Sequence, residues 1–223
     1  MNVLLGMISA TLIVLGLAVT ASPASDKDDL LIAAAERNDV ESVKRLLRDG
    51  AGVQARDAQG RTALVAATYR NHVEVARVLI EAGSDVNAQD AMQNSPLLLA
   101  GASGYLDILR MTLAARPDFT VYNRFGGTAL IPACERGHVE VVKVLLTTSI
   151  DVNHVNRLGW TALLEAILLS DGGTTHQEIV RLLLAAGAHP NLADHDGVTP
   201  LRHARQKGYR AIADLLVAAG GHE

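Results

Sequence analysis

Aromatic residues are scarce in this sequence: one Trp, four Tyr and two Phe make up 3% of its 223 residues. A compact core normally draws on some large rings, so the apolar content, mainly Leu, Ala and Val, suits closely spaced helices instead. Cysteine is nearly absent too, and the single Cys134 excludes an intramolecular disulfide and a cysteine-based zinc site. The net charge of −4 lacks the basic excess that generic nucleic-acid binding requires.

The N-terminal segment differs from the rest of the chain. Residues 3–19 (VLLGMISATLIVLGLAV) carry no charge, and small and polar residues (TASPASDKDD) follow them. This pattern predicts a signal peptide over residues 1–24, cleaved after Ala21 or Ala24, and therefore a periplasmic or secreted protein. The first residues contain no Lys or Arg, which is atypical of a signal peptide. Because an apolar run of 17 residues is at the lower limit for a membrane span, the alternative is an uncleaved helix that anchors the protein to a membrane, facing away from the cytoplasm.

Residues 25–223 form one domain built on a 33-residue repeat. The string RTALVAATYRNHVEVARVLIEAGSDVNAQD returns as GTALIPACERGHVEVVKVLLTTSIDVNHVN, 66 residues later. A hydroxyl residue marks five copies, with intervals of 33, 33, 33 and 38: Thr62, Ser95, Thr128, Thr161 and Thr199. With a degenerate first copy, this predicts six units, at about 26–59, 60–92, 93–125, 126–158, 159–196 and 197–223.

Each unit predicts a pair of helices. The hydroxyl residue is expected to cap the first helix by accepting an unpaired backbone N–H. An alanine follows five residues after the hydroxyl and indicates a contact too tight for a larger side chain: Ala67, Ala100, Ala133, Ala166 and Ala204. The second helix shows apolar spacing and is expected to end at a left-handed glycine, at Gly50, Gly83, Gly187 or Gly220. The expected fold is an all-α solenoid.

These units resemble the ankyrin repeat, with its motifs T-P-L-H-x-A, G-H-x-E-V-V-x-L-L and G-A-D-V-N, over essentially all of residues 26–223. NRFGGTALIPACERGHVEVV and VNHVNRLGWTALLEAILLSDGG further resemble small exported, periplasmic bacterial ankyrin proteins. The resemblance implies a stack of helix pairs with β-turn fingers, a protein-binding role without catalysis or cofactor, and a monomer.

Departures from the family pattern carry structural predictions. The His of T-P-L-H is aliphatic in four copies, but it is Arg202 in the last, which indicates a polar C-terminal cap, as residues 26–29 (DKDD) do at the front. Units three and four lack the stopping glycine, and Pro132 removes a backbone hydrogen bond early in a first helix. The middle of the array is therefore expected to be its least regular part.

The finger tips and concave face of units three to five are predicted to bind the partner, with two adjacent fingers at the centre. They carry large apolar and arginine side chains of the types enriched in binding hot spots, namely Tyr122, Arg124, Phe125, Arg157, Leu158 and Trp160. The expected partner is another protein, anchored by Phe125, Leu158 and Trp160, with the arginines contacting its acidic groups. The alternative is that Phe125 and Leu158 fold back as packing.

The 38-residue interval places five extra residues within 170–175, between the two helices of unit five. Asp171, Gly172 and Gly173 predict a turn there, and Leu168 and Leu169 are expected to extend the first helix. This insertion is either a neutral structural feature or a secondary contact site.

The remaining histidine, cysteine and acidic residues give little support for a metal site or for catalysis. His72, His138 and His176 occupy the G-H position and are interpreted as structural, while His189, Asp194, His195 and Asp196 match no metal-ligand spacing. Cys134 is expected to be buried and inert, and Glu135 and Glu165 are interpreted as ordinary variable positions rather than a carboxylate pair. No catalytic motif occurs. The alternative to an exported binding module is a membrane-tethered scaffold or an immunity-type partner.

Overall fold

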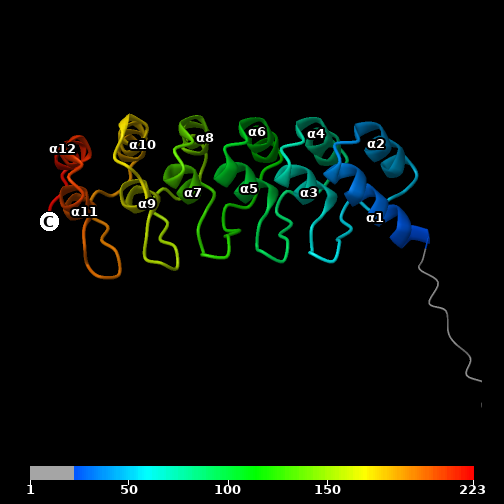
Figure 1. Cartoon of the computed structure of the whole chain (residues 1–223), viewed down its shortest axis with the longest axis horizontal. Helices are drawn as coiled ribbons and strands as arrows, with labels where there is room; N and C mark the ends of the chain where they lie inside the picture. The colour runs from blue at the N-terminus through cyan, green and yellow to red at the C-terminus, as the bar shows by residue number, and fades with distance from the viewer. Residues whose placement is uncertain (1–22) are drawn as a thin grey trace, which may run out of the picture.

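The computed structural model describes residues 23–223, so the predicted signal peptide up to residue 22, with its cleavage site at Ala21, lies outside the described residues. Within the described part, the regular structure consists of twelve helices in six antiparallel pairs (Figure 1). The first helices of the pairs are α1 (Pro23–Glu36), α3 (Ala63–Tyr69), α5 (Pro96–Ser103), α7 (Leu130–Glu135), α9 (Ala162–Leu168) and α11 (Pro200–Gln206). The second helices are α2 (Val40–Arg48), α4 (Val73–Glu81), α6 (Leu106–Ala114), α8 (Val139–Leu145), α10 (Thr174–Ala185) and α12 (Arg210–Ala218).

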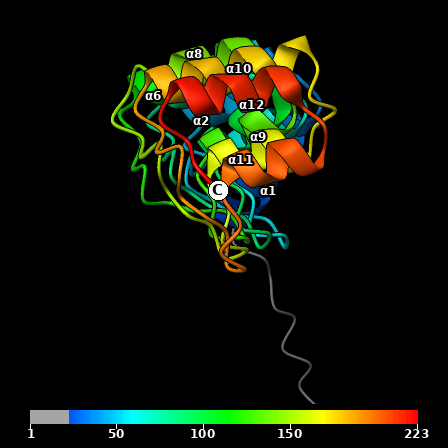
Figure 2. The ribbon, with the colours of Figure 1, turned by 90° about the vertical axis from the view of Figure 1, so that its left-hand side faces the viewer.

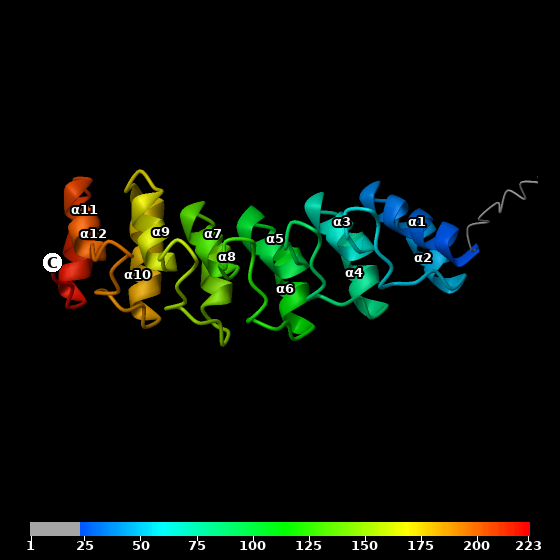
Figure 3. The same ribbon diagram turned by 90° about the horizontal axis from the view of Figure 1, so that it is seen from below.

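The pairs stack side by side into an elongated array of two helical layers (Figures 1 and 3). Seen end-on, the helices of each layer lie one behind another, and the loops between pairs project together as fingers (Figure 2). A continuous core runs between the layers, from Leu31 of α1 to Leu216 of α12. This arrangement confirms the predicted all-α solenoid. Among residues 23–223, no helix is long and apolar enough to span a bilayer.

Helix capping follows the predicted hydroxyl positions in four of five copies. Thr62, Ser95, Thr161 and Thr199 each accept a hydrogen bond from the backbone N–H three residues later. The prediction is wrong for Thr128, whose buried hydroxyl has no hydrogen-bond partner among the described residues. There α7 begins one residue later, with Ala129 at its N-cap position.

Pro132 gives a physical reason for this exception. In the other units, the residue that corresponds to Pro132 donates its N–H to the carbonyl of the capping residue, as Ala66 does to Thr62. Proline has no N–H to donate, so the first turn is not closed in the same way. The result is the shortest described helix, α7, with six residues.

The helix ends also bear out the predictions. All five repeated alanines are fully buried, and Gly50, Gly83, Gly187 and Gly220 have φ between 86° and 90°. In unit three, Arg116 takes the left-handed conformation in place of glycine, with φ 57°. In unit four, α8 ends early, and the Thr148 hydroxyl donates to the carbonyl of Leu145. The middle of the array is thus its least regular part, as expected.

The histidines of the G-H motif join neighbouring units. The Nε2 atoms of His72, His138 and His176 lie 3.0–3.2 Å from carbonyl oxygens at the ends of the preceding first helices, namely those of Glu36, Ala102 and Glu135. A carbonyl can only accept, so Nε2 carries the proton in each case. The structural interpretation of these histidines is confirmed.

Both ends of the described array present polar groups. Asp28 accepts a hydrogen bond from the Gly52 amide and Lys27 donates to the Asp49 carbonyl, so both side chains tie α1 to the end of unit one. Arg202 is exposed on α11, as predicted for a C-terminal cap. Polar side chains therefore cover surfaces that have no neighbouring unit.

The inserted residues of unit five lengthen the second helix rather than the first. The expected extension through Leu169 is wrong, because α9 ends at Leu168, the position at which α3 ends in unit two. The side chains of Ser170 and Asp171 accept the N–H groups of Gly172 and Gly173, which turns the chain and starts α10 at Thr174.

Candidate functional site

Five fingers share one construction, which begins with an acidic or amide side chain. That side chain accepts the backbone N–H groups two and four residues later, which closes a tight loop. The residues in this role are Asp57, Asp90, Asn123, Asn156 and Asp194. Because such loops fix the chain on both sides of the tip, the two tip side chains are presented at the same place in every unit.

The Asn123 finger (residues 123–128) and the Asn156 finger (residues 156–161) are bound to each other. The Arg157 amide donates to the Phe125 carbonyl at 2.8 Å, and the Arg157 guanidinium donates to the Arg124 carbonyl at 3.1 Å. Tyr122 stacks on His154, with 4.4 Å between ring centroids. Arg157 and Tyr122, both predicted to bind the partner, therefore also hold these two fingers in register.

A groove of about 410 Å³ lies between these fingers and the first helices α5, α7 and α9. Three of the predicted anchors line it, namely Phe125, Leu158 and Trp160. Phe125 is 46% exposed and Leu158 is 48% exposed, so neither side chain is folded away as packing. Trp160 is half-buried against the wall of the groove. The structure brings the apolar anchors together around one cavity.

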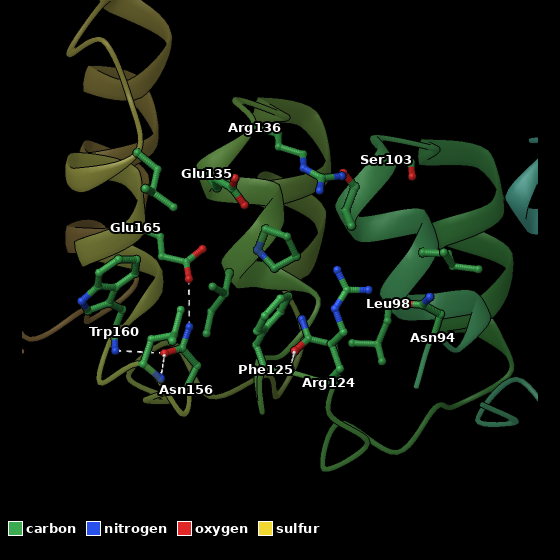
Figure 4. A pocket seen from close by; sticks show the side chains of 17 residues that line it. Asn94, Leu98, Ser103, Arg124, Phe125, Glu135, Arg136, Asn156, Trp160 and Glu165 are labelled. Atoms are coloured by element: carbon green, nitrogen blue, oxygen red, sulfur yellow. Dashed lines mark hydrogen bonds between the residues drawn. The ribbon is translucent and has the colours of Figure 1, made fainter. Parts of the chain in front are cut away.

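Arg124 lies at the rim of this groove. Its guanidinium sits over the Phe125 ring at 4.7 Å from the centroid. Such a cation over an aromatic face is attracted by the ring, so the two side chains orient each other. Figure 4 shows Arg124 and Phe125 on the same side of the pocket, across from Trp160.

Two carboxyl groups lie inside the groove. Glu165 of α9 is only 6% exposed, and it accepts a hydrogen bond from the Asn156 side-chain amide at 2.8 Å. Glu135, at the end of α7, is half-buried and lines the same cavity. Figure 4 shows the Glu165 carboxyl group between Trp160 and Phe125, and Glu135 above them, next to Arg136.

Burial and the neighbouring charge both act on Glu165. Burial raises the pKa of its carboxyl to about 7, and the negative charge of Glu135 adds to the increase, while the Asn156 hydrogen bond and the Arg136 charge oppose it. Arg136 is committed elsewhere, because its guanidinium donates to the Ala102 carbonyl at 2.8 Å. Within residues 23–223, neither glutamate forms an ion pair with a basic side chain.

This pair was rejected from the sequence alone, because the two residues lie on separate repeats and are 30 apart, whereas the repeat is 33. Equivalent positions on adjacent units differ by 33 residues, so the two glutamates differ by one helical turn on neighbouring first helices. Their interpretation as unrelated variable positions is wrong. Aligning the units and then comparing positions three apart would have brought Glu135 and Glu165 together.

Asp194 and Cys134 have structural surroundings. The Asp194 carboxylate accepts hydrogen bonds from the backbone amides of Asp196 and Val198, and it pairs with His203 at 2.7 Å. Both of its oxygens are therefore engaged within the chain. No cluster of three potential metal ligands occurs among the described residues. Cys134 is fully buried, and burial raises the pKa of its thiol well above the ordinary value, with a further contribution from the Glu165 charge. The predicted burial of Cys134 is confirmed, and its inertness stays a prediction that the raised thiol pKa favours.

The insertion packs against the last unit. The Tyr209 hydroxyl donates to the Ser170 carbonyl at 2.6 Å. A Cβ at Gly172, where φ is 69°, would lie 2.5 Å from the Tyr209 ring. Only glycine fits this approach. The loop that contains Asp171, Gly172 and Gly173 therefore has a structural partner within the chain, and its prediction as a secondary contact site stays a prediction.

Stacked helix pairs, hydrogen-bonded fingers and a groove between fingers and first helices define a repeat protein of the ankyrin class. A family model for ankyrin repeats matches residues 10–90, 30–121 and 97–194. The chain belongs to the ankyrin-repeat family.

Relatives agree with this assignment. An ankyrin repeat domain from Acinetobacter baumannii AYE, known from a crystal structure, is 57% identical, with a TM-score of 0.85 over 86% of this chain and 98% of that one. The ankyrin repeat protein EF0377 is 40% identical, with a TM-score of 0.83 over 85% of this chain and 97% of that one. The ankyrin repeat protein YahD of Escherichia coli (strain K12) is 58% identical over 57 residues, which are 26% of this chain and only 28% of that protein.

Proposed function

We propose that this protein is a non-enzymatic, exported interaction module that binds a partner protein in the groove between the Asn123 and Asn156 fingers. The ankyrin fold supports the general role, since such repeats generally mediate protein–protein interaction. One observation supports the location: Phe125 and Leu158 are large, half exposed and gathered around one cavity. Exposed apolar groups that form one patch next to a groove are typical of binding sites.

The partner's contacts are expected to centre on the apolar anchors. Phe125 and Leu158 would be covered on binding, with Trp160 forming the groove wall. Truncating an anchor of this kind typically costs about 2 kcal/mol or more of binding free energy, whereas rim residues cost little. Arg124 remains available for a polar contact at the rim, while Arg157 already bonds the neighbouring finger.

The test is affinity capture from the native extracytoplasmic fraction, read by mass spectrometry. Wild type is compared with Phe125→Ala/Leu158→Ala and with the control Met92→Ala/Val217→Ala, which removes two apolar side chains that are 53% and 50% exposed outside the groove. A partner retained by wild type and the control but lost by the groove variant supports the proposal. Equal retention by all three proteins, each shown to be folded, contradicts the location.

Export is tested by the intact mass of the protein purified from its native source. Loss of 21 or 24 residues from the N-terminus would support a cleaved signal peptide, with cleavage after Ala21 or Ala24. A full-length mass in the membrane fraction would favour the alternative, a membrane-tethered scaffold or immunity-type partner that faces away from the cytoplasm.

A further inference from the structure

The floor of the groove differs in character from its mouth. Around the mouth lie the apolar side chains Phe125, Leu158 and Trp160, whereas the buried part presents the carboxyl group of Glu165. One oxygen of Glu165 accepts from Asn156, and no second hydrogen bond or basic side chain satisfies this group within the described chain. A buried carboxylate without a compensating cation is unfavourable. No basic side chain of the described chain forms an ion pair with Glu165 at the floor of the groove.

Glu135 is a second carboxyl group in the groove without a basic partner. Its carboxyl group faces the same cavity and forms neither an ion pair nor a side-chain hydrogen bond among residues 23–223, as Figure 4 illustrates. The two arginines nearby do not neutralise the pair by contact: Arg136 donates to the Ala102 carbonyl, and Arg124 lies over Phe125. An anionic ligand would meet two carboxylates, and a purely apolar one would bury them without a partner.

We propose that the groove receives one lysine or arginine side chain from an extended segment of the partner protein, with its cationic end between the carboxylates of Glu135 and Glu165. Its aliphatic stem packs between Phe125, Leu158 and Trp160. Lys and Arg bury such stems along apolar surface while the charged end finds polar partners, and a cation beside aromatic faces is further stabilised. This inference rests on the proposed function, and it specifies which side chain of the partner protein enters the groove.

The chain contains one tryptophan, Trp160, and it lines the groove, so its fluorescence is a local probe of binding at this site. The probes are five nine-residue peptide libraries with Lys, Arg, Gln, Leu or Glu fixed at the centre and mixed residues elsewhere. Retention on the immobilised protein selects sequences, and their dissociation constants follow from Trp160 fluorescence. The Lys and Arg libraries are expected to be retained most strongly.

Glu165→Gln is the decisive variant, because glutamine keeps an oxygen for the Asn156 amide and removes only the charge. Near pH 8 it is expected to weaken binding of the selected Lys or Arg peptides by about tenfold or more, since a buried charge pair is lost. Glu81→Gln, which removes an exposed carboxylate on α4, should leave the affinity unchanged. Glu135→Gln is expected to weaken binding as well, but by less, because Glu135 is only half-buried and solvent screens its charge more.

The pH dependence gives a second readout. Besides burial, which raises the pKa of Glu165 most, two charged groups at the end of α7 act on it: Glu135 raises it and Arg136 lowers it. The Asn156 hydrogen bond also lowers this pKa. With the pKa at about 7, the ionised fraction rises about tenfold between pH 6 and pH 8, and the affinity of wild type should rise by the same factor. Glu165→Gln should abolish most of this rise.

Three results would overturn the inference: preference for Gln, Leu or Glu at the centre, equal binding by wild type and Glu165→Gln, or no retention of any library. The proposed function is judged separately. If the retained peptides ignore the Glu165 change but are lost with Phe125→Ala/Leu158→Ala, the groove still binds protein segments and only the cationic contact is wrong. If neither change affects retention, the groove itself is not the binding surface.

Discussion

Replacing Glu165 with glutamine should make the folded protein more stable near pH 8 and leave its stability unchanged near pH 4. The pKa of the carboxyl is raised from 4.5 to about 7 in the folded chain. A carboxyl with a raised folded-state pKa contributes stability that is fully present below its unfolded value and is lost as pH rises through the folded value. Wild type therefore loses stability between about pH 4.5 and pH 7, whereas the variant does not.

The structure sets the magnitude. At about 1.4 kcal/mol per pKa unit, the full difference would correspond to about 3.4 kcal/mol. The groove opens to solvent, which screens the charge, so we expect a gain of about 1–2 kcal/mol above pH 7. Glutamine has nearly the same shape as glutamate and can still accept the Asn156 hydrogen bond. The substitution should therefore not cause a loss of stability that hides this gain.

Urea unfolding at a series of pH values, followed by circular dichroism, measures the effect. Glu81→Gln serves as the control, since it removes an exposed charge of the same type, and surface changes of this kind usually alter stability by less than about 0.5 kcal/mol. A pH-independent difference between Glu165→Gln and wild type, or a destabilised variant at high pH, would refute the reasoning that burial and Glu135 disfavour the ionised form.

Four further changes test the frame of the repeat array, each by thermal or urea unfolding. Thr62→Val should cost about 1 kcal/mol because it removes a helix cap, whereas Thr128→Val should be neutral or stabilising because that hydroxyl is buried without a partner. Gly101→Ala should destabilise by about 1–3 kcal/mol, since its Cβ would lie 2.8 Å from a backbone oxygen of the neighbouring unit. Tyr209→Phe should cost about 0.5–1.5 kcal/mol through loss of its bond to Ser170, and unchanged stability would contradict a structural role for the insertion.

The frame could be predicted from the sequence because its signals are local and repeated. A hydroxyl three residues before a helical N–H, an alanine at a tight contact and a glycine at a left-handed end each act within a few residues, and the 33-residue period multiplies them. The exception at Thr128 shows the limit of this reasoning. The sequence shows that Pro132 removes a backbone hydrogen bond. It does not show that the helix then begins one residue later and leaves Thr128 without its capping bond, because this depends on the conformation of the whole first turn.

The groove was half predictable. Phe125, Leu158 and Trp160 stood out because large apolar residues at turn tips are unusual for exposed positions. Glu135 and Glu165 did not, because each is an ordinary helical residue, and only the stacking of α7 against α9 turns them into neighbours. The exposure of a residue at a turn tip can be predicted from the few residues around it. The burial of a carboxylate depends on how neighbouring units pack, which the local sequence does not show.

The same electrostatic energy links stability to binding at this site. If ionised Glu165 destabilises the folded chain above pH 7, a cationic side chain that neutralises it must recover that energy on binding. A bound Lys or Arg peptide should therefore raise the unfolding temperature of wild type more near pH 8 than near pH 5, at equal peptide concentration. In Glu165→Gln the two increments should be small and equal. If the peptide raises the unfolding temperature of wild type equally at both pH values, ionisation of Glu165 does not contribute to binding. The partner would then contact the apolar mouth of the groove rather than its floor.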